Sequence, residues 1–218
     1  MMLMLHVKVN DKLYYKNILL NDGVIACPTD TVYGFFSSAL SDKASKKIFS
    51  IKKRDLSKKL IVNVSDINVL SEYVYINDID KILINNFWPG ALSIIFNLND
   101  FGNTHISKFV SGNDRSICVR IPNHPQTLEL LQSVNIPLIS TSVNLSGEDP
   151  INCYSDIVKY FTDKVDLIIS DDYQNTNSTR VPSTIIDARG GDIKIIRNGL
   201  IKIKDIENCI NQHAKIIK

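Results

Sequence analysis

Short apolar runs alternate with segments of helical periodicity along most of this chain. The apolar runs predict strands at residues 24–27, 60–64, 92–96, 117–121, 137–141, 165–170, 184–187 and 193–197, and a further one at 1–8. Apolar residues recurring every three or four positions predict helices at 42–52, 79–87, 125–134, 154–161 and 203–211, with another opening at Ser65 or Asp66. This alternation indicates an α/β layer fold built on a mixed sheet.

Local signals support several of these boundaries. Ser41 or Asp42 is a suitable N-cap for the helix at 42–52. Pro89-Gly90 ends the helix at 79–87, and Pro125 is compatible with the first turn of the next predicted helix. Gly190-Gly191 predicts a hairpin between the last two strands.

Composition narrows the class of protein. The 218 residues are 44% hydrophobic and 22% charged, which is typical of a globular domain rather than a disordered chain. Lys and Arg number 25 against 23 Asp and Glu, so the net charge is +2. This balance argues against a nucleic-acid coat protein or a polybasic membrane binder, although it is compatible with a local basic cleft.

The chain shows no membrane or secretion signal. No apolar run is long enough to cross a bilayer, and residues 1–8 lack a basic leading region and a cleavage site. The four cysteines Cys27, Cys118, Cys153 and Cys209 are far apart and form no CxxC pair. We therefore expect a cytoplasmic protein with buried reduced thiols, rather than disulfides or a zinc site.

Polar segments follow several predicted strands, which is where open α/β sheets bind ligands. Residues 28–34 form a stiff turn that presents hydroxyls and backbone N–H groups, and 140–147 combine hydroxyls with an amide. Residues 182–184 and 197–199 add similar groups on the last hairpin. Each segment is explained either by a capped turn or by a ligand site.

A basic cluster joins Lys52, Lys53 and Arg54 to Lys58 and Lys59. Cations at the end of a helix stabilise its dipole on a solvated face, which is the simpler explanation. The alternative is a polyphosphate clamp, because Arg and Lys in one turn can hold several anionic oxygens. Neither a Walker A loop nor a GxGxxG motif is present, so a nucleotide here would not be held by a standard glycine loop.

Arg120 lies in a strand whose neighbours are apolar on both sides. A guanidinium in that setting is costly unless it is paired. Its fork suits a carboxylate, which either a protein Asp or Glu or a bound ligand could supply.

Together these segments resemble the YrdC-like threonylcarbamoyl-adenylate synthase family. The matching motifs, in family order, are 28–34 (PTDTVYG), 52–54 (KKR) with Lys58, 88–90 (WPG), 119–122 (VRIP), 142–147 (SVNLSG), 183–187 (STIID) and 197–199 (RNG). The resemblance covers roughly residues 15 to 200 and is to the short form, without an additional C-terminal domain. It implies one YrdC-like domain over 1–218, an open twisted mixed sheet flanked by helices with a concave ligand-binding face.

The resemblance implies a nucleotidyltransferase, an L-threonylcarbamoyladenylate synthase. Such an enzyme joins L-threonine, bicarbonate or CO2 and ATP into threonylcarbamoyl-adenylate and releases pyrophosphate. The product serves the threonylcarbamoyl-adenosine modification of tRNA, so tRNA and downstream threonylcarbamoyl-transfer proteins are candidate partners. Mg²⁺ is expected through the ATP phosphates, without a dedicated protein metal site. The chemistry needs no protein nucleophile, and the chain's histidines match no catalytic motif: His6, His105, His124 and His213.

The resemblance also assigns residues. Catalytic positions fall on Lys52, Arg54, Ser142 and Asn144. Threonine-binding positions fall on Thr31, Asn63, Arg120, Ser140 and Ser183. ATP-binding positions fall on Arg54, Lys58, Ser116, Ser142 and Arg197. Adjacent residues of an extended segment point in opposite directions, so we expect Lys59 to face away from the phosphates.

Three departures from the family pattern bear on the site. Asn63 stands where many relatives carry His, so that side chain can hydrogen-bond but cannot carry a proton. Pro150-Ile151 stands where a Pro-Ser pair usually provides a hydroxyl for ATP. Phe35-Phe36 is bulkier than the usual residues after Gly34, and we expect it to reshape the pocket floor.

Two other functions compete with the synthase. An RNA-binding module of the same fold would need exposed aromatic residues interleaved with Lys and Arg, of which residues 14–16 are a faint example. The related carbamoyl-adenylate module of hydrogenase maturation proteins belongs to much longer chains with zinc-finger and acylphosphatase segments, and nothing here resembles those.

Overall fold

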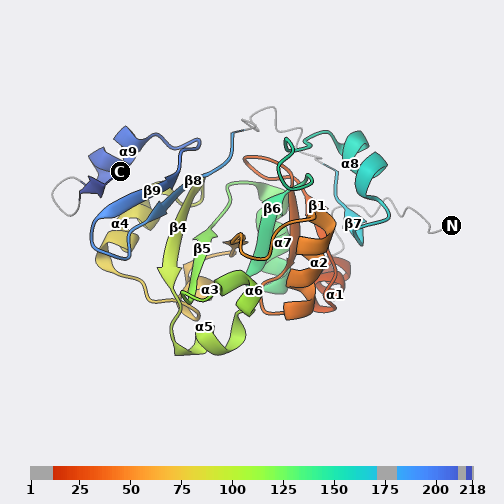
Figure 1. The fold of residues 1–218 in the computed structure, drawn as a ribbon, viewed down its shortest axis with the longest axis horizontal. Helices are drawn as coiled ribbons and strands as arrows, with labels where there is room; N and C mark the ends of the chain where they lie inside the picture. Colours follow the sequence, from red (N-terminus) through yellow and green to blue (C-terminus); the bar gives the residue numbers. More distant parts are fainter. Residues whose placement is uncertain (1–11, 171–180, 211–214, 218) are drawn as a thin grey trace.

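The computed structural model describes residues 12–170, 181–210 and 215–217. Within them, ten strands form one mixed sheet in the order β10-β9-β8-β4-β5-β3-β6-β2-β1-β7 (Figure 1). The strands are β1 (Ile25–Cys27), β2 (Gly34–Ser38), β3 (Ile61–Asn63), β4 (Leu92–Asn97), β5 (Ser116–Arg120), β6 (Leu138–Ser142), β7 (Leu167–Ile168), β8 (Thr184–Asp187), β9 (Ile193–Arg197) and β10 (Ile216–Ile217). The predicted strand at 1–8 lies outside the described residues.

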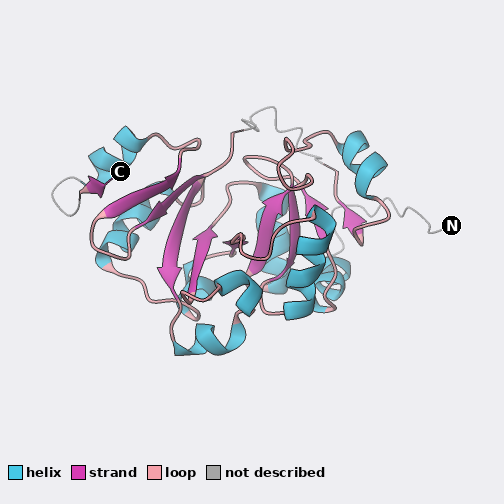
Figure 2. Ribbon diagram, viewed as in Figure 1, coloured by secondary structure: helices cyan, strands magenta, loops and turns pink. Residues whose placement is uncertain are grey.

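Helices border the sheet, as Figure 2 shows in cyan. They are α1 (Lys12–Leu20), α2 (Asp42–Lys52), α3 (Ile67–Ser71), α4 (Asp78–Phe87), α5 (Asp100–His105), α6 (Lys108–Ser111), α7 (Pro125–Val134), α8 (Tyr154–Phe161) and α9 (Ile203–Ile210). The pairs β3–β5, β4–β8, β1–β7 and β9–β10 are parallel and the other neighbours are antiparallel. The predicted mixed α/β sheet is confirmed.

Alternation along β2 separates two hydrophobic cores. Phe35 enters the larger core, where its ring meets that of Phe161 edge-on at 5.1 Å between centroids. Phe36 points to the opposite face, into a smaller core shared with Leu19 of α1 and Leu131 of α7. The sheet is therefore covered on both faces, as buried apolar strands require. Neither phenylalanine lines the polar pocket described below, although the Phe36 ring would be 3.0 Å from a Cβ at Gly34, which does line it.

Most predicted elements match, and the helix starts have the predicted caps. Ser41 Oγ accepts a hydrogen bond from the backbone of Ala44 at the start of α2, and Asp66 caps α3. The predicted strand at 165–170 is reduced to two residues, β7, and α9 is described to Ile210. The sequence analysis missed α1, β2, α5, α6 and β10.

The structure can be compared with the predictions made for the cysteines and for membrane-spanning segments. All four cysteines are free; Cys27 and Cys118 are buried and Cys209 is partly buried, but Cys153 is exposed, so the predicted burial of that thiol was wrong. Among the described residues, no helix is both long and apolar enough to cross a membrane.

Helix α4 begins with a capping box that holds a buried carboxylate. Asn77 Oδ1 accepts from the backbone of Asp80, and one oxygen of Asp80 accepts from the backbone of Asn77, at 2.8 and 2.9 Å. Asp80 is 4% exposed, and burial raises the pKa of its carboxyl to about 6. Nearby Asp187 contributes in the same direction.

We predict that Asp80→Asn changes the pH dependence of stability. Between the unfolded pKa of 3.8 and the folded pKa of about 6, the native protein binds more protons than the unfolded chain. The wild type therefore loses stability as pH rises through this window, by up to about 3 kcal/mol, and the variant does not. Urea unfolding at pH 4, 5, 6 and 7 measures the difference. Parallel stability curves for the two proteins would contradict the assignment.

Candidate functional site

A cavity of about 330 Å³ opens over one face of the sheet. Its walls come from the turn after β1, the segment before β3, the end of β5, the strand β6 with its following loop, and the hairpin β8–β9. The lining residues are Thr29, Thr31, Val32, Gly34, Arg54, Lys59, Leu60, Ile61, Arg120, Ser140, Thr141, Ser142, Asn144, Glu148, Pro150, Pro182, Ser183, Ile185 and Arg197. We call this cavity the pocket.

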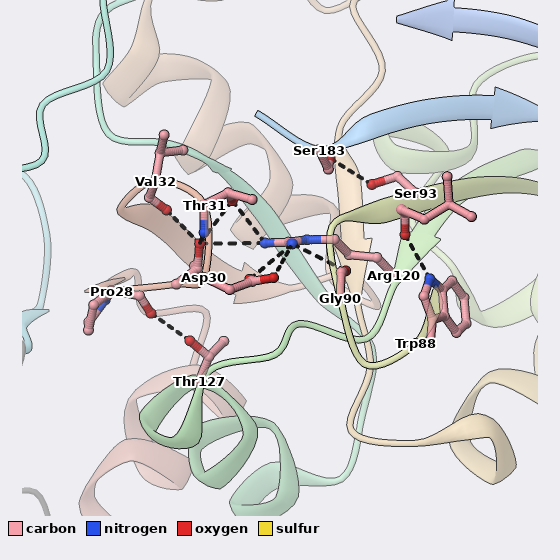
Figure 3. A network of polar contacts seen from close by, with 12 residues as sticks. Pro28, Asp30, Thr31, Val32, Trp88, Gly90, Ser93, Arg120, Thr127 and Ser183 are labelled. Atoms are coloured by element: carbon pink, nitrogen blue, oxygen red, sulfur yellow. Dashed lines mark hydrogen bonds and ion pairs between the residues drawn. The ribbon is translucent and has the colours of Figure 1, made fainter. Parts of the chain in front are cut away.

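Arg120 lines the pocket and lies at the centre of the network of polar contacts drawn in Figure 3. The residue is 3% exposed, and one guanidinium nitrogen forms an ion pair with Asp30 at 3.0 Å. The other nitrogen donates to the hydroxyls of Thr31 at 3.2 Å and Thr29 at 3.4 Å. Burial lowers the pKa of the guanidinium, and the Asp30 carboxylate opposes that shift. The buried charge thus has a protein carboxylate as its partner, one of the two alternatives that the sequence left open.

The turn that presents these groups is held at both of its ends. Thr29 Oγ1 donates to the carbonyl of Val32 at 2.7 Å, and it also accepts from the backbone of Thr31. Thr127 of α7 donates to the carbonyl of Pro28 at 2.5 Å. The predicted stiff turn is therefore confirmed, and its hydroxyls face Arg120 (Figure 3).

The last hairpin closes the opposite wall around Ser183. Arg197 donates to the Ser183 carbonyl from two nitrogens, at 2.8 and 3.0 Å, and to its hydroxyl at 3.0 Å. The same hydroxyl meets Ser93 Oγ of β4 at 2.8 Å. A Cβ at Gly199 would lie 2.4 Å from the carbonyl oxygen of Pro182, so only glycine permits this close approach.

Lys52 anchors the loop that carries two predicted catalytic residues. It is 1% exposed, and its ammonium donates to the carbonyl of Ser142 and to both oxygens of Asn144. Three acceptors match the three N–H donors of an ammonium, although burial lowers the Lys52 pKa to about 7. Ser142 Oγ donates to Asn144 Oδ1 at 2.6 Å, which completes the cluster. Lys52 is therefore a positioning residue beneath the pocket rather than part of its wall.

The structure gathers most of the predicted site residues on the pocket wall. Those that line it are Thr31, Arg54, Arg120, Ser140, Ser142, Asn144, Ser183 and Arg197. Arg54 is half-buried and donates to the carbonyl of Lys59 at 3.0 Å, and burial lowers the pKa of its guanidinium.

Four predicted residues lie elsewhere. Lys52 lies beneath the wall, and Lys58 is exposed outside it. Ser116 is fully buried, and its hydroxyl contacts Lys59 and Asp114. Asn63 is also fully buried, and neither atom of its side-chain amide has a hydrogen-bond partner.

The expected direction of Lys59 was wrong, because Lys59 rather than Lys58 lines the pocket. The sequence analysis also missed Thr29, Asp30 and Glu148 as site groups. Asp30 was within the quoted motif, and the need of Arg120 for a partner was the signal that could have found it. Pro150 lies on the wall, but Ile151, which stands at the usual position of the serine, does not line the pocket.

The groups of the pocket indicate binding and charge neutralisation rather than nucleophilic catalysis. Cys118 lies on β5 two residues before Arg120, and burial raises the pKa of its thiol to about 12, so it stays protonated. Among the described residues, no cluster of three His, Cys, Asp or Glu side chains could hold a metal ion. The hydroxyls and the single lining carboxylate of Glu148 are hard oxygen donors, which fit Mg²⁺ that arrives with a phosphate ligand.

A mixed sheet with a polar pocket lined by arginine, lysine and hydroxyl groups defines an α/β protein built to bind small anionic ligands. Residues 17–199 match the family model of Sua5, YciO and YrdC proteins, whose description is "Telomere recombination". The chain belongs to this Sua5/YciO/YrdC family, which confirms the resemblance seen in its motifs.

Similar proteins support this membership. A Methanocaldococcus jannaschii protein, provisionally named a threonylcarbamoyl-AMP synthase, is 35% identical over 196 residues, covering 90% of this chain and 89% of the relative. The crystal structure of P. abyssi Sua5 complexed with L-threonine matches with a TM-score of 0.86 at 24% identity, over 97% of this chain. This chain spans only 60% of that Sua5 chain. E. coli YciO matches with a TM-score of 0.78 at 23% identity, over 91% of this chain and 94% of YciO.

We predict that Lys52→Met and Arg54→Ala impair the protein in different ways, the first by lowering its stability and the second by removing a pocket residue. Lys52→Met leaves buried oxygens without a donor and should lower the free energy of unfolding by roughly 1–3 kcal/mol. Arg54→Ala removes a half-buried wall residue and should change stability by about 0.5 kcal/mol or less. Urea unfolding and ATP binding, measured together, separate the two effects, with exposed Lys46→Met of the same helix as the control. A Lys52→Met protein as stable as wild type would refute the anchoring role.

Proposed function

We propose that this protein is a threonylcarbamoyl-AMP synthase. The observation that supports this most directly is the division of the pocket into two chemically different ends. One end holds Arg120 with the threonine hydroxyls, and the other holds Arg54 and Lys59. Arg197 joins the two, because it donates to Ser183 and lies near both Arg120 and Arg54. An amino-acid end beside a cationic end suits a reaction that joins a carbamate to a nucleotide. The named relative from M. jannaschii supports the same activity.

At the amino-acid end, the guanidinium of Arg120 is the group that binds the threonine carboxylate. Its ion pair with Asp30 keeps the fork charged and oriented, and the hydroxyls of Thr31, Ser140 and Ser183 supply neutral hydrogen bonds around the ligand. That the Sua5 structure is a complex with L-threonine supports the choice of amino acid. Asn63, with both amide atoms unpartnered, lies beside Arg120 in the β3–β5 register but is fully buried behind the wall, so we assign it no ligand contact.

At the cationic end, Arg54 and Arg197 bind the phosphates of ATP. Ser142 and Asn144, on the loop that Lys52 positions, bind the same phosphates. Mg²⁺ would be held by the ATP phosphates with oxygens of Ser142 and Glu148 nearby, and it would neutralise phosphate charge. The protein's own contribution is to position the reactants and to stabilise the leaving pyrophosphate with fixed cations.

The chemistry that the family resemblance implies needs no protein nucleophile. The threonine amine captures CO2 as a carbamate, whose oxygen attacks the α-phosphorus of ATP while the bond to pyrophosphate breaks. Starting from bicarbonate, one water is released as well. The carbamate nucleophile forms at the Arg120 end, and the leaving pyrophosphate departs among the cations.

An RNA-binding module without synthase activity is the competing function. Such a surface stacks bases on aromatic side chains. None of the described residues that line the pocket is aromatic. The small hydroxyl-rich lining therefore favours small ligands over RNA.

We predict that pyrophosphate release requires L-threonine, bicarbonate, ATP and Mg²⁺ together. Serine should be a poorer substrate, because one methyl group in a pocket contributes only about 1–3 kcal/mol. The measurement is a coupled pyrophosphate assay in which each component is omitted in turn. Equal turnover without any amino acid would exclude the synthase, and tight RNA binding without turnover would support the alternative.

We predict that Arg120→Lys raises the threonine requirement about 10- to 100-fold, the effect of losing one charge-assisted bidentate contact. Lysine keeps a charge for Asp30 but loses the fork. Bound threonine should therefore raise the melting temperature of the wild type and that of the variant much less. A thermal-shift titration with ATP is the control, and its response should be nearly unchanged. Equal protection of both proteins by threonine would show that Arg120 serves only its ion pair with Asp30.

A further inference from the structure

A row of polar side chains crosses four neighbouring strands beside the cationic end of the pocket. Extending the β3–β5 register by two residues places Lys59 opposite Ser116. Ser116 is paired with Asn97 of β4, and extending the β4–β8 register places Asn97 opposite Arg189. Lys59 donates to Ser116 Oγ at 2.6 Å, and Arg189 donates to Asn97 Oδ1 at 3.1 Å.

Asp114 lies between the two cations of this row. One of its oxygens contacts the ammonium of Lys59, and the other accepts from Ser116 Oγ and lies 3.6 Å from Arg189. Partial burial acts to raise the pKa of the Asp114 carboxyl, but Lys59, the Ser116 hydroxyl and Arg189 together outweigh it and lower that pKa. Arg189 is also paired with Asp187 at 2.7 Å, so it remains held whichever way Lys59 turns.

Lys59 differs from Arg189 because it also lines the pocket. Its side chain is 36% exposed and that of Asp114 is 47% exposed, so the ion pair between them is a solvated one that contributes little to stability. A phosphate oxygen in the pocket would form a stronger charge-assisted contact with the same ammonium. Arg189 would still neutralise Asp114 after such an exchange.

The charges around the pocket make that exchange favourable for an oligophosphate. Arg54, Lys59 and Arg197 line the wall, while Arg120 is already paired with Asp30. Glu148 is the one carboxylate among the described lining residues. Lys59 is thus a third cation at this end, and its present partner is easily replaced.

We propose that Lys59 binds the phosphates of an oligophosphate ligand, and that its ammonium is paired with Asp114 when no ligand is bound. In the ligand-free protein Asp114 and Ser116 position the ammonium at the rim of the pocket. An entering phosphate chain takes the ammonium from Asp114, which Arg189 then neutralises alone. The identity of the ligand as ATP rests on the proposed function, whereas the exchange requires only a chain of phosphates.

Direct binding tests this exchange without relying on catalysis. Isothermal titration calorimetry with Mg-ATP, inorganic tripolyphosphate and AMP compares the wild type with Lys59→Ala, Lys59→Arg and Asp114→Asn. Lys59→Ala should raise the Kd for ATP and tripolyphosphate about ten-fold, the usual effect of one charge-assisted contact, and leave AMP nearly unchanged. Lys59→Arg should restore most of the affinity.

Asp114→Asn should act in the opposite direction, because it removes the competitor for the ammonium. It should lower the Kd for ATP about two- to five-fold, a range set by the strength of exposed ion pairs. This gain should vanish in the Lys59→Ala background. Lys81→Ala and Asp78→Asn are the matched controls, since Lys81 and Asp78 form an exposed ion pair on α4 away from the lining residues.

Several results would overturn the proposal. If ATP affinity were unchanged in Lys59→Ala, or were lost in Lys58→Ala instead, Lys59 would have only a structural role through its contacts with Ser116 and Asp114. Asp114→Asn weakening ATP binding would show that the ion pair must persist. A wild type that binds neither ATP nor tripolyphosphate would also refute it. Failure of the synthase is distinguishable, because a wild type that binds ATP without releasing pyrophosphate leaves the Lys59 result intact.

Discussion

The buried charge of Arg120 is the constraint on which the pocket depends. A guanidinium with 3% exposure must be paired, and its partners come from the turn after β1, which lies ninety residues earlier in the chain. The ion pair with Asp30 therefore fixes that turn over the end of β5, and the carbonyl of Gly90 approaches the same nitrogen at 3.5 Å. The amino-acid end of the pocket exists because one strand residue carries a charge that the sheet alone cannot satisfy.

Lys52 is a second buried cation that needs partners within the protein. Lys52 and Arg120 therefore differ in role from the more exposed cations Arg54 and Lys59. Lys52 and Arg120 are held by protein oxygens and set the shape of two loops. Arg54 and Lys59 bond mainly to carbonyls or solvated carboxylates, which a ligand replaces at little cost. Burial thus separates Lys52, which only shapes the pocket, from Arg54 and Lys59, whose partners a ligand can replace, whereas Arg120 both fixes a loop and lines the pocket.

Sequence patterns predicted the layered fold and most of the pocket, because periodicity and motif order record local structure and family membership. They failed where the outcome depends on contacts between distant segments. Strand β2 was missed since its five residues are all buried, so no alternation of apolar and polar residues marks it. Lys59 was assigned away from the phosphates by alternation along an extended segment, but its direction is set by Ser116 and Asp114. Ser116 was predicted to bind ATP, but its hydrogen bond with Lys59 leaves it fully buried behind the pocket wall.

The register of β5 also sets the distance over which the proposed reaction must work. Ser116, Cys118 and Arg120 share one face of the strand, so the row at Lys59 and the guanidinium of Arg120 are separated by roughly 13 Å at about 3.3 Å per residue. Between them, Cys118 stays neutral and adds no charge. A carboxylate bound at one end and a phosphate chain bound at the other therefore have room to meet between them, close to Arg197, whose charge acts on Cys118. Rigid strands, rather than loops, hold this separation, so the two anionic ligands are brought together without either end having to move.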